Sequence, residues 1–279
     1  MLIAAASGWH GRDEITELLA NIRMDLGLQG RIALISGASA GIGRATAKML
    51  AEEGVQTIVV ARRELQLQEL ASEIEGRGGA TPMVLVEDLN QRDCFARIRD
   101  RVLGRFGYID ILVNNLGQAR PLTWDSPDAD WDEAFALNFT PPRKLAAAFI
   151  PAMRDRKFGR ILNLTSTLEP THVSGSMTSK AAVQVWAKGL SRVLGRDGIT
   201  VNCISPGLLM TDQIRRHHIP RWLPTKEDQE KFLQQDLPVG RFGEPEDAAR
   251  LICFLCSPFS GYITGQRIYV DGGWNRHIA

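Results

Sequence analysis

Short apolar runs alternate with longer stretches of helical spacing along most of this chain. From about residue 31 the runs are aliphatic and β-branched, without the in–out alternation of a half-exposed strand. Such runs are typical of strands that are covered on both faces, as in a parallel sheet. Repeated strand–helix alternation predicts a doubly wound α/β domain, with a parallel seven-stranded sheet and helices on both faces. The expected strands are residues 32–35, 57–60, 83–86, 109–113, 161–164, 199–204 and 268–270.

Two segments do not follow this alternation. Residues 1–27 precede the first strand, and we interpret them as an N-terminal extension, with a pattern over 13–23 that suits a short amphipathic helix. Residues 28–279 are then a single domain. The stretch 206–238 is long for a connection, and it predicts a helical flap over a site rather than a bare loop.

Charge and cysteine content exclude several classes of function. The chain has 33 Lys+Arg against 32 Asp+Glu, so nothing favours nucleic acid or an anionic membrane surface. No apolar run reaches the ~20 residues of a membrane span. Four scattered cysteines argue against a disulfide framework, and Cys253 and Cys256 lie in an apolar stretch typical of a buried helix face. We expect no metal site and a reducing, cytoplasmic location.

A glycine-rich turn, Ser-Gly-Ala-Ser-Ala-Gly-Ile-Gly over 36–43, follows the first expected strand. Its three glycines let the backbone turn sharply and approach a ligand closely. The next helix directs free N–H groups and its positive dipole end at that ligand, which suits a pyrophosphate. Between a strand and a helix, the turn predicts a dinucleotide-binding Rossmann fold. The residues predicted to hold the dinucleotide here are Gly37, Ser39, Ala40, Gly41, Ile42 and Gly43.

Two arginines, Arg62 and Arg63, follow the second expected strand. An acidic residue at this place binds the 2′-hydroxyl of adenosine, whereas an arginine accommodates a 2′-phosphate. Arginines at the start of a helix oppose its dipole, and a bound phosphate removes that conflict. The pair therefore favours NADP over NAD, although Ala40 stands where a second basic residue would have strengthened the preference.

Together with later motifs in the same order, these features resemble the short-chain dehydrogenase/reductase family over roughly residues 28–273. The segments concerned are Asp88-Leu89, Asn-Asn-Leu-Gly over 114–117, Leu-Asn-Phe over 137–139, the strand-like 159–166, the turn 201–207 followed by Thr211, and 270–273. The resemblance implies cofactor contacts at Asp88, Leu89, Asn115, Gly117, Lys180, Pro206, Gly207, Leu209 and Thr211, and catalytic roles for Asn138 and Ser166.

The same resemblance implies an activity and an assembly. The activity is hydride transfer between NADP(H) and a carbonyl or alcohol substrate, as in reductases of ketones and 3-oxoacyl compounds. The assembly is a homotetramer or a homodimer that uses the long helices around 128–155 and 177–196. The substrate itself does not follow from the residues.

The family's Tyr-x-x-x-Lys signature is incomplete here, because Ser176 stands four residues before Lys180. In the family this tyrosine is the general acid that protonates the carbonyl oxygen. A phenol has a pKa near ~10, which a neighbouring lysine can lower. An alkyl hydroxyl is far less acidic and lacks the length of the ring, so Ser176 cannot copy that role. The three tyrosines of the chain, Tyr108, Tyr262 and Tyr269, lie outside this helix.

Three hypotheses fit this pattern. The first is an active oxidoreductase whose proton comes from a water held by Ser176, Lys180 and Asn138, or from His172. The second is reduction of a C=C bond in a dienoyl or enoyl thioester. The dienoyl-CoA reductase branch resembles this chain in having Ser-x-x-x-Lys, but it supplies a tyrosine after the fifth strand, about where this chain has Leu168. The third is a cofactor-binding regulatory or assembly protein with little turnover.

Overall fold

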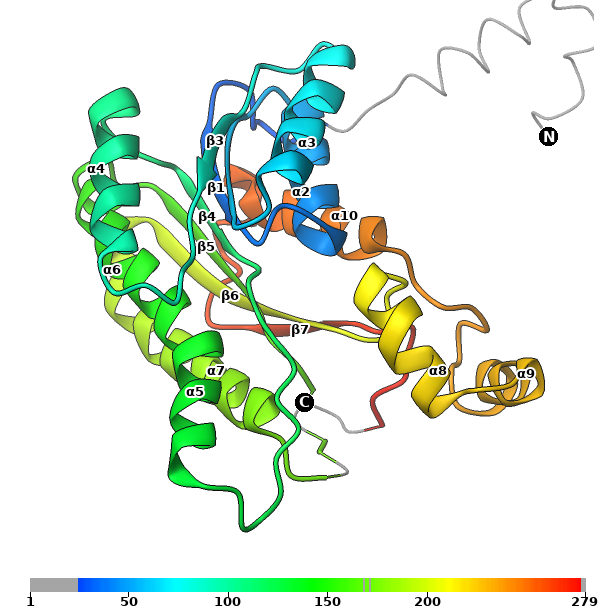
Figure 1. The fold of residues 1–279 in the computed structure, drawn as a ribbon. Helices are drawn as coiled ribbons and strands as arrows, with labels where there is room; N and C mark the ends of the chain where they lie inside the picture. The colour runs from blue at the N-terminus through cyan, green and yellow to red at the C-terminus, as the bar shows by residue number, and fades with distance from the viewer. Residues whose placement is uncertain (1–24, 168, 171, 277–279) are drawn as a thin grey trace, which may run out of the picture.

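The sheet has seven parallel strands in the computed structural model, which describes residues 25–167, 169–170 and 172–276. The strand order is β3-β2-β1-β4-β5-β6-β7, so the predicted doubly wound sheet is confirmed (Figure 1). The helix expected over 13–23 lies outside the described residues. The strands are β1 (Ile32–Ser36), β2 (Gln56–Ala61), β3 (Met83–Val86), β4 (Ile111–Asn114), β5 (Gly159–Leu164), β6 (Ile199–Pro206) and β7 (Arg267–Val270).

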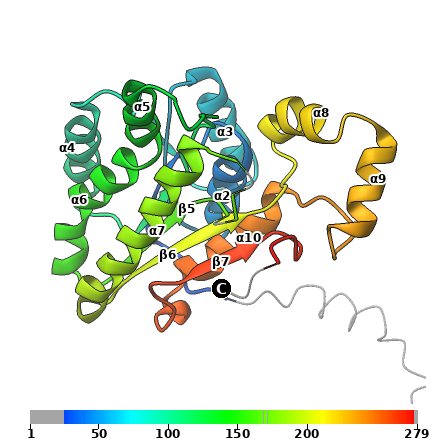
Figure 2. The same cartoon turned by 90° about the horizontal axis from the view of Figure 1, so that it is seen from below.

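Helices cover both faces of the sheet (Figures 1 and 2). One face carries α2 (Gly41–Glu52), α3 (Glu64–Gly76) and α10 (Pro245–Cys256). The other carries α4 (Cys94–Phe106), α6 (Thr140–Asp155) and α7 (Gly175–Leu194), with α5 (Asp128–Asn138) against α7. The short 3-10 turns are η1 (Gly195–Asp197) and η3 (Pro258–Ser260).

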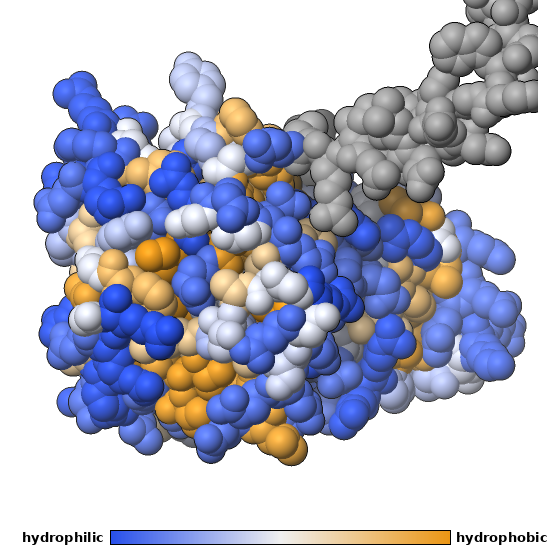
Figure 3. Space-filling model, turned by 90° about the horizontal axis from the view of Figure 1, so that it is seen from above, coloured by the Kyte–Doolittle hydropathy of each residue, from blue (hydrophilic) through white to orange (hydrophobic). Residues whose placement is uncertain are grey.

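Successive side chains of a strand enter opposite halves of the core. In β1, Leu34 packs with residues of α4, α6 and α7, whereas Ile35 packs with residues of α2, α3 and α10. Because both faces are covered, strand residues on either side are apolar, which is why the sequence shows continuous runs. On the face that Figure 3 shows, hydrophilic residues predominate and hydrophobic residues gather in smaller patches.

The strand order reverses between β1 and β4, and this reversal positions the site. The chain moves outward from β1 to β2 and β3, and then returns to the other side of β1 as β4. Connections from the carboxyl ends of β1 and β4 therefore diverge and leave a crevice, the usual ligand site of such sheets. Ser36 Oγ accepts hydrogen bonds from the backbone N–H groups of Asn115 (3.1 Å) and Leu116 (3.3 Å), which holds the two strand ends together.

The segment between β6 and α10 is helical, as its length and sequence predicted. It contains a single π-helical turn, η2 (Ile214–His218), then α8 (Ile219–Trp222) and α9 (Lys226–Gln235). A capping box between Thr225 and Asp228 begins α9. Both cartoon views show α8 and α9 projecting from the side of the sheet (Figures 1 and 2).

Cys253 and Cys256 belong to the core, as expected, with 2% and 0% of their surface exposed on α10. Burial raises the pKa of both thiols far above the ordinary value, so neither is a reactive thiolate. Within the described part of the chain, no group of His, Cys, Asp and Glu side chains is arranged to hold a metal ion. None of the helices described is long and apolar enough to cross a membrane.

Candidate functional site

The glycine-rich turn between β1 and α2 needs its glycines for two different reasons. Gly37 and Gly41 have φ values of +65° and +56°, in the left-handed region that residues with a Cβ rarely adopt. At Gly43 the constraint is space, because a Cβ there would lie 2.6 Å from the carbonyl oxygen of Gly37. Ala40 precedes α2 without a side-chain cap, and the first turn of α2 contains no acidic residue. The positive end of this helix is therefore available to an anion.

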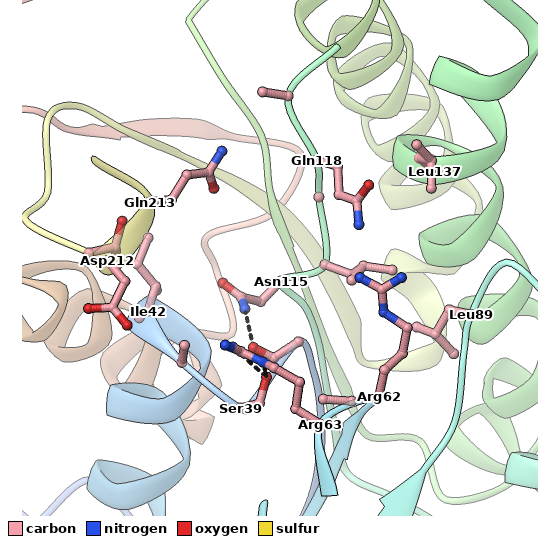
Figure 4. A pocket seen from close by; sticks show the side chains of 18 of the residues that line it. Ser39, Ile42, Arg62, Arg63, Leu89, Asn115, Gln118, Leu137, Asp212 and Gln213 are labelled. Carbon is pink, nitrogen blue, oxygen red and sulfur yellow. Dashed lines mark hydrogen bonds between the residues drawn. The ribbon is translucent and has the colours of Figure 1, made fainter. Parts of the chain in front are cut away.

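A cavity of about 680 Å³ lies beside this turn, at the carboxyl ends of the strands (Figure 4). Its size is typical of clefts that hold a small ligand. The turn, the ends of β2 and β3, the loop after β4 and the start of the flap form its walls. The expected site residues that line it are Gly37, Ser39, Ala40, Gly41, Ile42, Arg62, Arg63, Asp88, Leu89, Asn115, Gly117 and Thr211.

Arg62 and Arg63 line the cavity but differ in their contacts. Arg63 donates from Nε (3.2 Å) and from a terminal nitrogen (2.9 Å) to Ser39 Oγ, so it is tied to the glycine-rich turn. Arg62 is exposed and has no hydrogen bond or ion pair to any residue that the structure describes, and its side chain points into the cavity in Figure 4. The N-terminus of α3, which Arg63 precedes, has no side-chain cap. A phosphate bound here would meet two guanidinium groups and this helix end.

The end of β3 supplies the part of the wall that contains Asp88 and Leu89, two of the expected cofactor contacts. Leu89 is buried, and the carboxylate of Asp88 accepts a hydrogen bond from the backbone N–H of Asn90 (3.1 Å), which shapes the turn. Glu87 also lines the cavity, but its carboxylate is paired with Arg97 (2.7 Å). An apolar side chain next to a shaped polar turn suits the edge and face of a heteroaromatic ring.

Asn115 and Asn138 both hold backbone at the loop after β4. Asn115 Nδ2 donates to the carbonyl oxygen of Gly37 (3.1 Å), so this loop is fixed against the glycine-rich turn. Asn138, 2% exposed, accepts at Oδ1 from the backbone N–H of Gln118 (3.0 Å) and donates from Nδ2 to the carbonyl oxygen of Ala134 (3.0 Å). Both ends of the Asn138 amide are thus used within the protein.

Lys180 reaches from α7 to the same loop. A Cβ placed on Gly117 would lie 3.0 Å from Lys180 Nζ and 3.3 Å from Asn138 Oδ1, so the three residues are clustered. Gly117 in turn lines the cavity, whereas Lys180 stands behind it. Burial lowers the pKa of Lys180 to about 8, because desolvation disfavours the charged amine.

Ser166 and Ser176 lie near opposite ends of the loop between β5 and α7. Ser176 Oγ lies 3.0 Å from Ser174 Oγ, and Ser174 caps α7 by accepting from the backbone N–H of Met177 (3.4 Å). The backbone carbonyl of Ser166 accepts from Gln184 Nε2 (2.9 Å), which ties it to α7. Its hydroxyl has no hydrogen-bond partner among the described residues, and neither Ser166 nor Ser176 is among the residues that line the two cavities.

Other expected cofactor residues support the cavity from outside or lie beside it. The N–H of Gly207 donates to the carbonyl oxygen of Val270 (2.9 Å), so the turn that begins at Pro206 is fixed to β7. Leu209 lines a separate cavity of about 380 Å³, on the far side of this turn. Thr211 does line the main cavity, where its methyl group would lie 3.0 Å from a Cβ on Gly41.

Sequence reasoning missed several residues that line the main cavity. They come from the ends of β2 and β3, the loop after β4, α5 and the flap, and they are Val60, Ala61, Glu87, Asn90, Leu116, Gln118, Ala119, Arg120, Leu137, Asp212, Gln213, Arg216 and His217. The position of the flap was predictable, but its inward-facing side chains were not. None of the three tyrosines lines this cavity: Tyr269 lines the second one, Tyr108 packs under Arg156 and Tyr262 is fully exposed.

The chain is similar to known proteins over most of its length. A family model described as Enoyl-(Acyl carrier protein) reductase matches residues 37–275. The chain is 35% identical over 255 residues to the 3-oxoacyl-(acyl-carrier-protein) reductase FabG of Thermotoga maritima. The match covers 88% of this chain and 98% of that protein.

Two solved structures are similar over nearly their whole length. One is YwfH, an NADPH dependent reductase involved in bacilysin biosynthesis, with a TM-score of 0.85, 28% identity, and coverage of 90% of this chain and 100% of that one. The other is the L-sorbose reductase from Gluconobacter frateurii complexed with NADPH and L-sorbose. Its TM-score is 0.84 with 30% identity, and the match covers 91% of this chain and 100% of that one.

Proposed function

This chain belongs to the short-chain dehydrogenase/reductase family, and from that premise we propose that it is an NADP-dependent oxidoreductase with a non-standard proton donor. Its substrate class is a ketone or 3-oxoacyl compound and the corresponding alcohol. The observation that carries the proposal is one continuous cavity. It joins the glycine-rich turn and the two arginines to Gly117, behind which Lys180 stands.

The residues present fit NADP(H). The uncapped N-terminus of α2 would hold the pyrophosphate, because no Cβ blocks the turn and no carboxylate competes in its first helical turn. Arg62, and Arg63 with its partner Ser39, would hold the 2′-phosphate. When bound, the cofactor supplies or accepts the hydride. The chain's own residues must then orient the carbonyl group and move a proton.

We assign the proton to Lys180. With a pKa of about 8, its ammonium group is more acidic than that of an exposed lysine. A water held by Lys180 and Ser176 would carry the proton to the carbonyl oxygen, leaving a neutral amine on Lys180 and an alcohol as product. The free hydroxyl of Ser166 would donate a hydrogen bond to the same oxygen, which stabilises its developing negative charge. Asn138 keeps the loop in place by holding the N–H of Gln118.

His172 remains the alternative donor. It is exposed and precedes α7, whereas Lys180 is half-buried and lies beside Gly117 of the cavity wall. A donor that is shielded from bulk water gives up its proton to the substrate more selectively. This difference favours the lysine-bound water.

Reduction of a C=C bond in an enoyl or dienoyl thioester is a second candidate. The printed description of the matching family model, together with the Ser-x-x-x-Lys spacing of Ser176 and Lys180, favours it. Position 168, where a compensating tyrosine would stand, lies outside the described residues. Both candidate functions use the same cavity and differ in the bond that accepts the hydride, which is C=O in the first and C=C in the second.

A substrate panel tests these proposals directly. We expect oxidation of NADPH with ketones or 3-oxoacyl thioesters, measured as loss of its absorbance. Turnover with enoyl or dienoyl thioesters alone would contradict the carbonyl proposal and support the second candidate. Tight NADPH binding without turnover on any member would instead indicate a cofactor-binding regulatory or assembly protein.

A Ser176→Tyr arm of the same assay tests the proton donor. If the site is a degenerate form of the usual one, a phenol beside Lys180 should raise ketone reduction about tenfold or more, because general acid catalysis contributes on that scale. A lower activity would show that Ser176 belongs to a different mechanism. Thermal unfolding of the variant checks that the larger side chain is accommodated next to Ser174.

The arginine pair predicts the coenzyme preference. Arg62→Gln removes a guanidinium that has no partner in the described protein, so only ligand binding should suffer. A charge-assisted hydrogen bond contributes about 1.5–3 kcal/mol, which predicts roughly tenfold weaker NADPH binding or more. NADH binding should change little. Titration calorimetry with both coenzymes measures this.

Arg77→Gln is the matched control, because Arg77 lies at the other end of α3 and pairs with Glu52 at the surface. Exposed pairs contribute about 0–1 kcal/mol, so neither coenzyme should bind differently. If wild-type protein binds NADH more tightly than NADPH, the assignment of Arg62 and Arg63 to a 2′-phosphate is wrong.

We also propose a homodimer or homotetramer in a reducing, cytoplasmic compartment. Large apolar side chains remain exposed on α7, with Val185 at 76% and Val193 at 66%, which supports an interface on that helix. The four cysteines are free and buried, as in proteins of reducing compartments.

A further inference from the structure

The first part of the flap lies against the N-terminus of α2. Thr211 is the first flap residue to line the main cavity, and its Cγ2 would lie 3.0 Å from a Cβ on Gly41, the first residue of α2. Asp212, Gln213, Arg216 and His217 follow it along the same cavity wall. Side chains of the flap therefore face the place where the proposed function puts a pyrophosphate.

Two consecutive flap arginines have opposite surroundings. Arg215 points away from the cavity: its Nε donates to the carbonyl oxygen of Met210 (2.9 Å), and its guanidinium pairs with Glu244 (3.2 Å). Arg216 lines the cavity and has no hydrogen bond or ion pair to any described residue. Asp212 lies four residues earlier, but no ion pair joins it to Arg216. A guanidinium group without a partner in a ligand cavity is thus left for a ligand.

The backbone around Arg216 is unusual. Ile214–His218 forms a single π-helical turn, a conformation that is rare and occurs often at functional sites. Arg216 and His217 both face the cavity from this turn, while Arg215 is held outside. The π-helical turn therefore separates one arginine that is paired outside the cavity from one that is presented to the cavity.

We propose that Arg216 is a further cofactor-binding residue, whose guanidinium group binds the pyrophosphate across from the N-terminus of α2. This inference rests on the proposed function, because it needs a dinucleotide in the cavity. The pyrophosphate carries two negative charges, and α2 offers N–H groups from one side only. Arg216 supplies the opposing charge from the flap.

Binding measurements with dinucleotide fragments test this assignment. Arg216→Gln should weaken NADPH, NADH and ADP-ribose by a similar factor of about five- to tenfold, since all three contain the pyrophosphate and a charged hydrogen bond is lost. Binding of 2′-AMP, which has only the 2′-phosphate, should be unchanged. Titration calorimetry at one fixed salt concentration gives each Kd. Arg216→Gln changes an exposed residue, so its thermal unfolding should match that of the wild type.

Arg215→Gln is the matched control, because the same substitution one residue earlier removes an equal charge outside the cavity. We expect it to change each Kd by less than about twofold, as for other exposed pairs. An equal loss in both variants would mean a general effect of flap charge and would overturn the assignment. Unchanged NADPH binding in Arg216→Gln would overturn it as well.

Two further outcomes would assign Arg216 to a different ligand group. A loss that extends to 2′-AMP would place Arg216 on the 2′-phosphate. A raised KM confined to substrates with a phosphorylated carrier, with cofactor binding intact, would place it on the substrate. Either result overturns the assignment while the proposed function stands. If wild-type protein binds none of the dinucleotides, the proposed function itself fails.

Discussion

Replacing Lys180 with methionine should lower kcat for carbonyl reduction by about 10²- to 10⁴-fold, the usual contribution of a general acid. Methionine keeps the length and apolar stem of lysine but cannot hold or release a proton. Lys180 Nζ lies beside Gly117 and Asn138, so its loss removes a cation from this cluster. Steady-state kinetics with NADPH and the best ketone or 3-oxoacyl substrate measures the effect.

The pH dependence separates a proton donor from a structural lysine. Reduction requires the ammonium form, which is lost as pH rises through about 8, so the reduction rate should fall above that pH. Oxidation of the alcohol requires the neutral amine and should rise over the same range. A Lys180→Arg variant should not show the fall near pH 8, because guanidinium stays protonated.

Lys188→Met provides the control, two turns further along α7. Lys188 is exposed and donates to the carbonyl oxygen of Gly265 (3.1 Å), away from the cavity. Its variant should keep the wild-type rate and pH profile. If Lys180→Met retains both the rate and the fall near pH 8, the proton comes from another group, and His172 becomes the residue to test.

Gly43→Ala should weaken NADPH binding by about tenfold to a hundredfold, with a parallel loss of stability. The added Cβ would lie 2.6 Å from the carbonyl oxygen of Gly37, a backbone atom that can move only with the turn. Overpacking of this kind costs about 1–3 kcal/mol, and the turn relieves it by leaving the geometry that binds the ligand. Titration calorimetry and thermal unfolding report the two effects separately.

Gly104→Ala is the matched change in a helix where a Cβ would meet nothing within 4 Å. It should leave NADPH binding unchanged and raise stability by up to about 1 kcal/mol, because alanine favours a helix over glycine. Wild-type NADPH affinity in Gly43→Ala would mean that the turn is not the pyrophosphate site.

Elements with strong local patterns were predicted well. The run at 57–60 became β2, because a strand covered on both faces is apolar on both sides, and the run at 83–86 became the edge strand β3. The run at 109–113 placed β4 too early, since it begins at Ile111. Ile109 is fully buried without being in the strand, and Asp110 accepts from the backbone N–H of Ile32 (3.0 Å). An apolar run does not distinguish a strand from the buried residue before it.

The candidate site was predicted where its residues belong to short, contiguous motifs. The glycine-rich turn and Arg62-Arg63 were found in this way, and they line one cavity. Leu209 belongs to a motif too, yet it lines the second cavity, because the turn after β6 directs successive residues to different sides. Arg216 carries no local signal, since Arg215 next to it has the same side chain and faces away.

The sequence by itself determined how strands and helices alternate along the chain and the backbone freedom of the glycine-rich turn. Both are local properties, the first of hydrophobic spacing and the second of residues without a Cβ. Only the tertiary structure decided which side chains meet in the cavity. Lys180 meets Gly117 and Asn138 behind the cavity wall, because the strand order brings three distant segments together at the carboxyl ends of the strands. The turn is thus the basis for the proposed cofactor site, and the packing of Lys180 is the basis for the proposed proton transfer without a tyrosine.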